Sequence, residues 1–274
     1  MRIDLHSHST ASDGQLSPAE LLARAAEKEV DVLALTDHDT VAGLAEARLA
    51  AARHGVRLID GVEISCLWES KEIHVVGLNI DPEHGQLIQL LDEQQRRREA
   101  RARLMGERLA KARFPGGYEG ARALAGNAPI TRTHMARWLL SQGAADNMGK
   151  VFKKYLSRGN PGYVPPAWCP LAEAIATIQQ AGGAAVVAHP TRYDLSNKWI
   201  KRLLADFAEA GGDAMEVSMA QQSPQERANL GQWSQEFKLS ASVGSDFHFP
   251  SHWRELGRQL WLPKDASPVW TRFI

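Results

Sequence analysis

The chain has 274 residues, and its 32 Lys plus Arg balance its 32 Asp plus Glu. A chain of this length can form one large α/β domain, or a core domain with an insertion, and either buries enough apolar surface to be stable without covalent cross-links. Zero net charge excludes an overall field that attracts duplex nucleic acid or an anionic membrane, so any anion site must be local.

The two cysteines, Cys66 and Cys169, form neither a disulfide framework nor a CxxC zinc site, which suits a reducing compartment. The sequence has no signal-peptide pattern and no apolar run long enough to span a bilayer. We therefore expect a cytoplasmic protein without a membrane or protein partner.

Short apolar runs alternate along the chain with amphipathic helical patterns, several of which open on a capping Ser or Thr. The expected strands are 2–5, 32–36, 56–59, 73–78, 184–188, 214–218 and 239–243. The expected helices are 18–28, 41–54, 171–180, 198–210 and 224–237. Strand–helix alternation predicts parallel strands. Seven units with polar clusters after the strands favour a closed barrel, although an open doubly wound sheet has the same alternation.

The alternation stops between residues 82 and 170. This stretch contains a long arginine-rich helical pattern at 87–113, a Gly116-Gly117 turn, and shorter helical patterns at 133–141 and 150–156. We interpret it as a helical insertion. The predicted organisation is a barrel formed by 1–81 and 171–274, with 82–170 contributing to the substrate site.

Five of the ten histidines follow predicted strands closely: His6, His8, His38, His189 and His248. His6 and His8 are alternate residues, so both imidazoles leave the strand on the same side and can bind one cation. His54, His84 and His252 have no such placement and are interpreted as ordinary structural or surface histidines.

Carboxylates accompany these histidines. Asp37-His38-Asp39 follows a strand, and three ionisable residues at one strand end are costly to keep together unless cations compensate them. Glu63 is flanked by apolar residues, so we expect its carboxylate to point inward and to need a partner. Asp13 precedes Gly14 and is either a turn residue or a ligand.

The last strand ends in Asp246-Phe247-His248, which repeats the alternate-residue spacing, and Gly244 permits close approach of the backbone. His189-Pro190 ends the predicted strand 184–188, where His189 is either a ligand or a packed histidine before a rigid turn. Arg192 is well placed for a phosphate, because a guanidinium matches phosphate oxygens with a planar fork; an exposed loop arginine is the alternative.

Taken together, His6-Ser7-His8, Asp37-His38, Gly61-Val62-Glu63, His189-Pro190 and Asp246-Phe247-His248 make nearly the whole chain resemble the polymerase and histidinol phosphatase (PHP) family. The resemblance implies a distorted (β/α)7 TIM-like barrel with two or three divalent cations. It assigns His6, His8, Glu63 and Asp246 to one metal, Glu63, His74 and His134 to a second, and Asp13, His38 and His248 to a third. His189 completes the set.

The insertion resembles the small bacterial branch of that family that acts on nucleotides, through the segments 129–134 and 152–159. The resemblance makes Arg132, Lys153 and Arg158 candidate substrate contacts. A solvated helix face is the alternative for Lys153 and Arg158.

The expected reaction is metal-dependent hydrolysis of the 3′-phosphate of a nucleoside 3′,5′-bisphosphate, with His189 or Asp246 as the acid for the leaving oxygen. Alternatives are 5′–3′ exoribonuclease action on short 5′-phosphorylated RNA, histidinol phosphate hydrolysis, a non-catalytic binding module and an amide hydrolase. Nitrogen and oxygen ligands admit Mn²⁺, Fe²⁺, Zn²⁺ or Mg²⁺, and we favour Mn²⁺.

Overall fold

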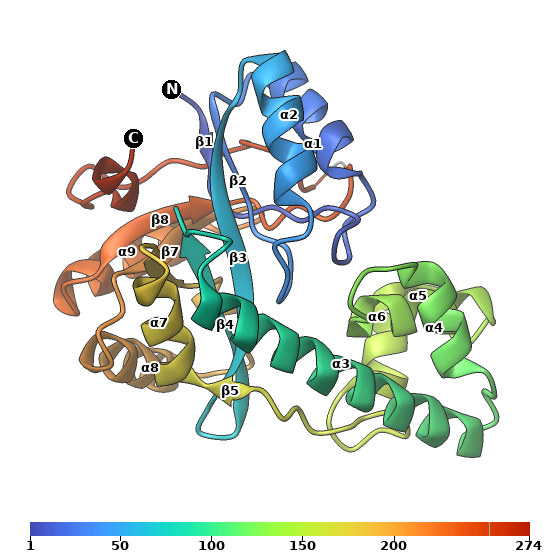
Figure 1. The fold of residues 1–274 in the computed structure, drawn as a ribbon. Helices are drawn as coiled ribbons and strands as arrows, with labels where there is room; N and C mark the ends of the chain where they lie inside the picture. Colours follow the sequence, from blue (N-terminus) through green and yellow to red (C-terminus); the bar gives the residue numbers. More distant parts are fainter. Residues whose placement is uncertain (252) are drawn as a thin grey trace.

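In the computed structural model, which describes residues 1–251 and 253–274, one sheet curls into a barrel (Figure 1). His252 lies outside the described residues. The strand order around the barrel is β1-β2-β3-β4-β6-β7-β8, and the short β5 pairs with β3. The strands are β1 (Ile3–Asp4), β2 (Val32–Leu35), β3 (Arg57–Trp68), β4 (Lys71–Leu78), β5 (Cys169–Pro170), β6 (Ala184–Val187), β7 (Ala214–Met219) and β8 (Ser240–Gly244).

Backbone contacts bring the first and last strands of this path together. The Leu5 amide donates to the Val243 carbonyl at 3.0 Å, and Ser7 and Phe247 form a parallel bridge just beyond the strands. The sheet is therefore nearly closed, which confirms the predicted TIM-like barrel. Closure also places the segments that follow β1 and β8 side by side, and both carry predicted metal ligands.

The prediction that all strands run parallel is wrong for β4, which is antiparallel to both β3 and β6. β3 extends to Trp68, well beyond the predicted end at residue 59, and turns directly into β4 through Glu69 and Ser70. Both turn residues have positive φ, at 48° and 60°, which is the backbone that a two-residue hairpin requires. Neither is the Gly or Asn that normally marks such a turn, so the hairpin could not be predicted from these residues.

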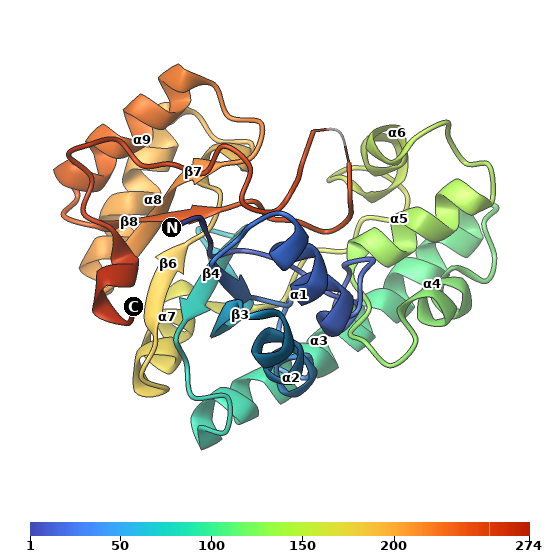
Figure 2. The ribbon, with the colours of Figure 1, turned by 90° about the horizontal axis from the view of Figure 1, so that it is seen from above.

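Helices cover the outside of the barrel, with α1 and α2 beside β1 and β2, and α7 to α9 on another side (Figures 1 and 2). Ser17 begins α1 with a capping box, and Pro18 occupies its first turn, as local helix signals require. The bounds are α1 (Pro18–Glu27), α2 (Leu44–His54), α7 (Leu171–Gln180), α8 (Asn197–Glu209) and α9 (Pro224–Glu236), with 3-10 turns at Pro190–Arg192 and Val269–Arg272.

The insertion forms a lobe of its own beside the barrel, and the long α3 leads into it (Figure 1). A separate cluster of buried apolar side chains holds the lobe together. Its helices are α3 (Gly85–Lys111), α4 (Gly117–Ala125), α5 (Arg132–Ser141), α6 (Met148–Val151) and the π-helix η1 (Phe152–Leu156). The single helix predicted at 150–156 is thus a short α-helix that continues as a π-helical turn.

Buried ion pairs attach α3 to the barrel. Arg98 contacts the Asp39 carboxylate and stacks on Trp168, with its guanidinium carbon 4.8 Å from the ring centre. Arg101 lies 3.3 Å from Glu72 and stacks on the same ring. Part of the arginine-rich pattern therefore faces the barrel rather than solvent. Both cysteines are buried and free, as predicted, and no helix in the described part of the chain is long and apolar enough to cross a bilayer.

Phe207 fills the interface between α8 and the sheet and is fully buried. Phe207→Ala should lower the free energy of unfolding by about 3–5 kcal/mol, because a large cavity replaces the ring. Leu49→Ala is the control, since Leu49 is 65 % exposed, and should change stability by less than about 0.5 kcal/mol. Chemical denaturation of both variants measures the difference; equal stabilities would contradict the packing described.

Candidate metal centre

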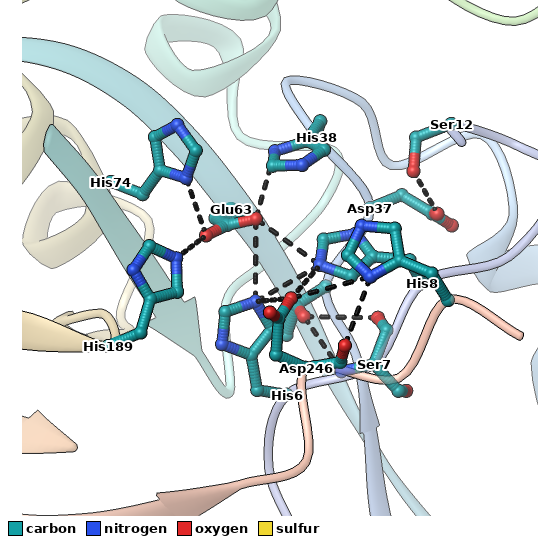
Figure 3. Close-up of polar contacts among 12 residues, drawn as sticks. His6, Ser7, His8, Ser12, Asp37, His38, Glu63, His74, His189 and Asp246 are labelled. Atoms are coloured by element: carbon teal, nitrogen blue, oxygen red, sulfur yellow. Dashed lines mark hydrogen bonds and ion pairs between the residues drawn. The ribbon is translucent and has the colours of Figure 1, made fainter. Parts of the chain in front are cut away.

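His6 and His8 leave β1 on the same side, as their spacing predicted, and both are completely buried. Their Nε2 atoms lie 3.1 Å apart (Figure 3). Gly244 on β8 permits this packing, because a Cβ at that position would lie 2.3 Å from the His6 Cβ. Two imidazoles with converging nitrogens in the interior of a barrel are a typical arrangement for a shared cation.

Glu63 occupies the middle of the site, with its carboxylate completely buried (Figure 3). One oxygen lies 2.9 Å from His38 Nδ1, and the other lies 2.9 Å from His74 Nδ1 and 3.1 Å from His189 Nε2. The first oxygen is also 3.3 Å from His8 Nε2. The predicted inward orientation is therefore confirmed, and the two oxygens are directed at different groups of histidines.

Asp13 and Asp246 approach the histidines from two loops. The Asp13 carboxylate lies 3.2 Å from His248 Nε2 and 3.9 Å from His38 Nε2. One oxygen of Asp246 lies 3.3 Å from His8 Nε2, and its other oxygen accepts a hydrogen bond from Arg192 at 2.7 Å. Asp13 is thus part of the cluster and not only a turn residue.

Three groups of these side chains have ligand atoms close enough to hold one cation each, and together they cover seven of the ten predicted ligands. The groups are His8, Asp13, His38 and His248; His6, His8 and Glu63; and His38, Glu63 and His74.

The donor atoms of these groups fit divalent cations. Several buried nitrogen and oxygen atoms of the site form no hydrogen bond of suitable geometry with the described residues, although some lie close to charged neighbours, and this is costly unless another ligand satisfies them. These atoms are His8 Nδ1, Asp13 Oδ1, His38 Nδ1, Glu63 Oε2 and His189 Nδ1. All donors are nitrogen or oxygen, which disfavours metals that select thiolates.

Electrostatics shift the pKa values of the ligands in both directions. Burial would lower the pKa of His6 and of His248, but Glu216 and Glu63 raise it for His6, and Asp13 and Asp246 raise it to about 9 for His248. These two imidazoles therefore release a proton when a cation binds. Burial alone would raise the pKa of the Glu63 carboxyl, but His38, His6 and His74 hold it well below its usual range. Burial, together with the charges of His248 and His38, lowers the pKa of His8 to about 3, so its imidazole stays neutral. A carboxylate anion beside neutral imidazole is the state required for coordination.

Glu216 supports the centre from β7 and was missed by the sequence analysis. One of its oxygens accepts a hydrogen bond from His6 Nδ1 at 2.7 Å, and the other accepts from the backbone amide of His189 at 2.6 Å. The only signal in the sequence was an acidic residue inside the apolar strand 214–218. Such a contact fixes the ring orientation of a ligand and strengthens its basicity.

Two more buried carboxylates organise the loops. Asp4 accepts from the backbone amides of Ser245 and Gly257, both at 2.9 Å, and so ties β1 to the loops after β8. Asp37 accepts from the Ser9 and Ser12 hydroxyls at 2.7 and 2.5 Å. Asp37 was recognised only as part of a cluster, and its partners now show that it holds the loop carrying Asp13.

His134 lies apart from the three groups, in the capping box that begins α5, where its Nδ1 accepts from the Thr131 amide at 3.1 Å. Its assignment as a ligand remains a prediction. Of the predicted substrate contacts, Arg192 hydrogen-bonds Asp246 and Arg132 reaches the metal cavity, whereas Lys153 and Arg158 are exposed and do not line it. The structure therefore brings only part of the predicted substrate set to the centre.

The cavity above the ligands has a volume of about 190 Å³ and joins the barrel to the insertion. On the barrel side it is lined by ligands and by Glu72, which lies 3.3 Å from Arg101 and 3.5 Å from Arg132. On the insertion side it is lined by Arg98, Arg101, Thr131, Arg132, Thr133 and Phe152. Three arginines and a cluster of metal ligands thus face one space. Such a space suits an anionic ester.

The sequence profile described as PHP domain matches residues 4–159. The chain belongs to the PHP family. It is 55 % identical over 269 residues to a protein of Salmonella typhimurium named 5′-3′ exoribonuclease Rnm, covering 97 % of this chain and 92 % of that one. It is 44 % identical over 270 residues to a 3′,5′-nucleoside bisphosphate phosphatase of Chromobacterium violaceum, with 98 % and 95 % covered.

A solved structure from Bifidobacterium adolescentis, described as a metal-dependent phosphoesterase, superposes with a TM-score of 0.81 at 27 % identity and covers 98 % of this chain and 93 % of that one. With the donor cluster, these relatives make the chain a metal-dependent phosphoesterase of the PHP family. The sequence-based expectation of a hydrolase is confirmed, and the binding-module alternative is not supported.

Glu216→Gln should weaken divalent metal binding about 10-fold to 100-fold, because the amide cannot replace the charged acceptor behind His6. Competition with a chelator, followed by metal analysis, measures the affinity. Glu236→Gln is the matched control, because Glu236 lies on the surface of α9 and pairs with Lys201. Unchanged affinity in Glu216→Gln would show that this carboxylate does not support the ligands.

Proposed function

We propose that this PHP phosphoesterase hydrolyses the P–O3′ bond of a nucleoside that carries a 5′-phosphate. The supporting observation is the single cavity that combines the metal ligands with Arg98, Arg101 and Arg132 of the insertion. A substrate with two phosphate groups has one for the metal ligands and one for the guanidinium groups. Guanidinium groups match phosphate oxygens through paired hydrogen bonds.

The activities in the relatives' names support cleavage of this P–O3′ bond. Removing the 3′-phosphate of a nucleoside 3′,5′-bisphosphate breaks P–O3′, and so does release of the first nucleotide from 5′-phosphorylated RNA. In both reactions the leaving group is the 3′-oxygen of a 5′-phosphorylated nucleoside. The bisphosphate is our leading substrate, and short RNA is a second candidate that the 55 % identical exoribonuclease favours.

We propose manganese as the cation at His6, His8, Glu63 and the ligands around them, with Fe²⁺, Zn²⁺ and Mg²⁺ as alternatives. When bound, such ions neutralise charge on the phosphoryl oxygens and lower the pKa of attacking water. Glu63, buried among the histidines, fixes the spacing of the sites. The insertion forms one wall of the cavity.

His189 is the better of the two candidate proton donors. Burial would raise the pKa of Asp246, but His248, His8 and His6 hold it well below its usual range, so this carboxyl stays ionised. Arg192 donates to the same carboxylate and favours the ionised form further. His189 lines the cavity, and its Nδ1 lacks a hydrogen-bond partner among the described residues.

A phosphate-release assay tests the substrate. The manganese-loaded protein should release phosphate from adenosine 3′,5′-bisphosphate with a kcat/KM at least about 100-fold above those for adenosine 5′-monophosphate and histidinol phosphate, because only the bisphosphate uses both halves of the cavity. Short 5′-phosphorylated RNA is assayed in parallel by product length. Equal activity on histidinol phosphate, or none on either 5′-phosphorylated nucleotide substrate, would refute the proposal.

His189→Ala tests the proton donor. The variant should lose about 100-fold or more in kcat on adenosine 3′,5′-bisphosphate, whose ribose leaving group needs a proton. It should lose much less on p-nitrophenyl phosphate, whose leaving group departs as an anion. Metal content of the variant is measured beside the wild type. Equal losses on both substrates would assign His189 to metal binding instead.

A further inference from the structure

A second hollow, of about 440 Å³, opens beside the metal cavity and has no role in the function proposed so far. Thr133, Phe152 and His248 line both spaces, so the hollow is continuous with the metal centre. Its floor and walls come from α5, α6 and η1 of the insertion and from the loop that follows β8. The hollow thus lies between the two lobes.

The loop presents aromatic side chains to this hollow at the surface. Phe249 is 45 % exposed and Trp253 is 75 % exposed, although large aromatic side chains normally bury most of their surface. Phe152 adds a third ring from the opposite wall. Exposed aromatic faces beside a catalytic centre are suited to stacking with planar ligands such as nucleobases.

Two arginines also line the hollow, and each is attached to a loop that carries a metal ligand. Arg137 donates to the backbone carbonyl of Asp13 at 2.8 Å. Arg254 donates to the backbone carbonyl of Asp246 at 2.9 Å and lies 3.4 Å from the carboxylate of the same residue. A guanidinium has five N–H donors, so both retain donors for a further acceptor. None of the described residues that line the hollow is Asp or Glu, so its charge complements an anion.

The hollow and the arginines Arg98 and Arg101 of the metal cavity border different strands of the barrel. Arg98 and Arg101 contact Asp39 and Glu72, which belong to the region of β2 to β4. The hollow is instead bordered by the loops after β7 and β8. A chain whose 5′-phosphate contacts the arginines of the cavity therefore has the hollow available beyond the scissile phosphate.

We propose that the hollow is a subsite for single-stranded RNA and holds the nucleotide that follows the scissile phosphate. Its base stacks on Trp253 and Phe249, and the phosphate on its 3′ side binds Arg137 and Arg254. This inference rests on the proposed function, because it requires cleavage at P–O3′. A nucleoside bisphosphate has no following nucleotide and does not use the subsite.

The test compares Trp253→Ala and Phe249→Ala with the wild type on 5′-phosphorylated tetraribonucleotide and on adenosine 3′,5′-bisphosphate. Loss of a stacked base should raise KM for the RNA roughly 5-fold or more, while KM and kcat for the bisphosphate change less than about 2-fold. Trp261→Ala is the matched control, because this tryptophan is 55 % exposed and lies outside the hollow. It should leave both substrates unaffected.

Equal losses on both substrates would overturn the proposal, because the rings would then serve the terminal nucleotide or the fold. An unchanged KM for the RNA would overturn it as well. Binding of a 3′-labelled, 5′-phosphorylated RNA is measured by fluorescence anisotropy in an Asp13→Asn background, in which cleavage should be lost. This binding measurement distinguishes failure of the subsite from failure of the proposed function. If the wild type cleaves neither substrate, the proposed function fails and the subsite fails with it; if the wild type cleaves both substrates but Trp253→Ala binds the RNA as tightly as the wild type, only the subsite fails.

Discussion

The buried carboxylate of Glu63 is the constraint on which the rest of the centre depends. A charge in the interior of a barrel costs several kcal/mol unless opposite charges and hydrogen bonds compensate it. His38, His74 and His189 surround its two oxygens at hydrogen-bond distance, and Glu216 orients His6 beside them. Several buried nitrogen and oxygen atoms of the site nevertheless form no hydrogen bond with the described residues, and divalent cations would coordinate such atoms.

The barrel carries the metal ligands, whereas the insertion brings arginine side chains to the same cavity. Buried contacts of Arg98 with Asp39, and of Arg101 with Glu72, hold α3 against the sheet, and Trp168 packs beneath both guanidinium groups. These contacts make one cavity out of two lobes that have separate apolar cores. Substrate choice can therefore change through the insertion while the metal ligands stay constant.

Under the proposed function, the metal cavity and the hollow beside it correspond to the two kinds of substrate that the relatives' names mention. A nucleoside bisphosphate needs only the metal cavity with its arginines, whereas an RNA chain needs somewhere to continue beyond the bond that breaks. The aromatic hollow between the lobes provides such a surface next to His248. Under the proposed function, one centre acts on a monomer and on the end of a polymer, because the bond and the leaving oxygen are the same.

Sequence alone determined those features that depend on local periodicity. Alternate residues leaving a strand point to the same side, so His6 and His8 could be predicted to converge. The same spacing pointed to Asp246 and His248, but these lie beyond β8 and Asp246 has a positive φ, so the loop brings them together. The apolar neighbours of Glu63 likewise showed that its carboxylate faces inward. Strand and helix patterns predicted an α/β fold and favoured the barrel, but an open doubly wound sheet has the same alternation, so the family resemblance and the contacts between β1 and β8 were needed to distinguish the two.

Tertiary structure decided what depends on contacts between distant segments. The β3–β4 hairpin turns on Glu69 and Ser70, which carry no turn signal, so its antiparallel direction was hidden. In the sequence, Glu216 was only an acidic residue within an apolar strand, and its contact with His6 forms only in the folded barrel. Charge runs in the insertion looked alike in sequence, yet Arg98 is buried against the barrel while Lys153 is exposed. The physical reason is that periodicity fixes the direction of a side chain, whereas its partner is fixed only when the chain closes.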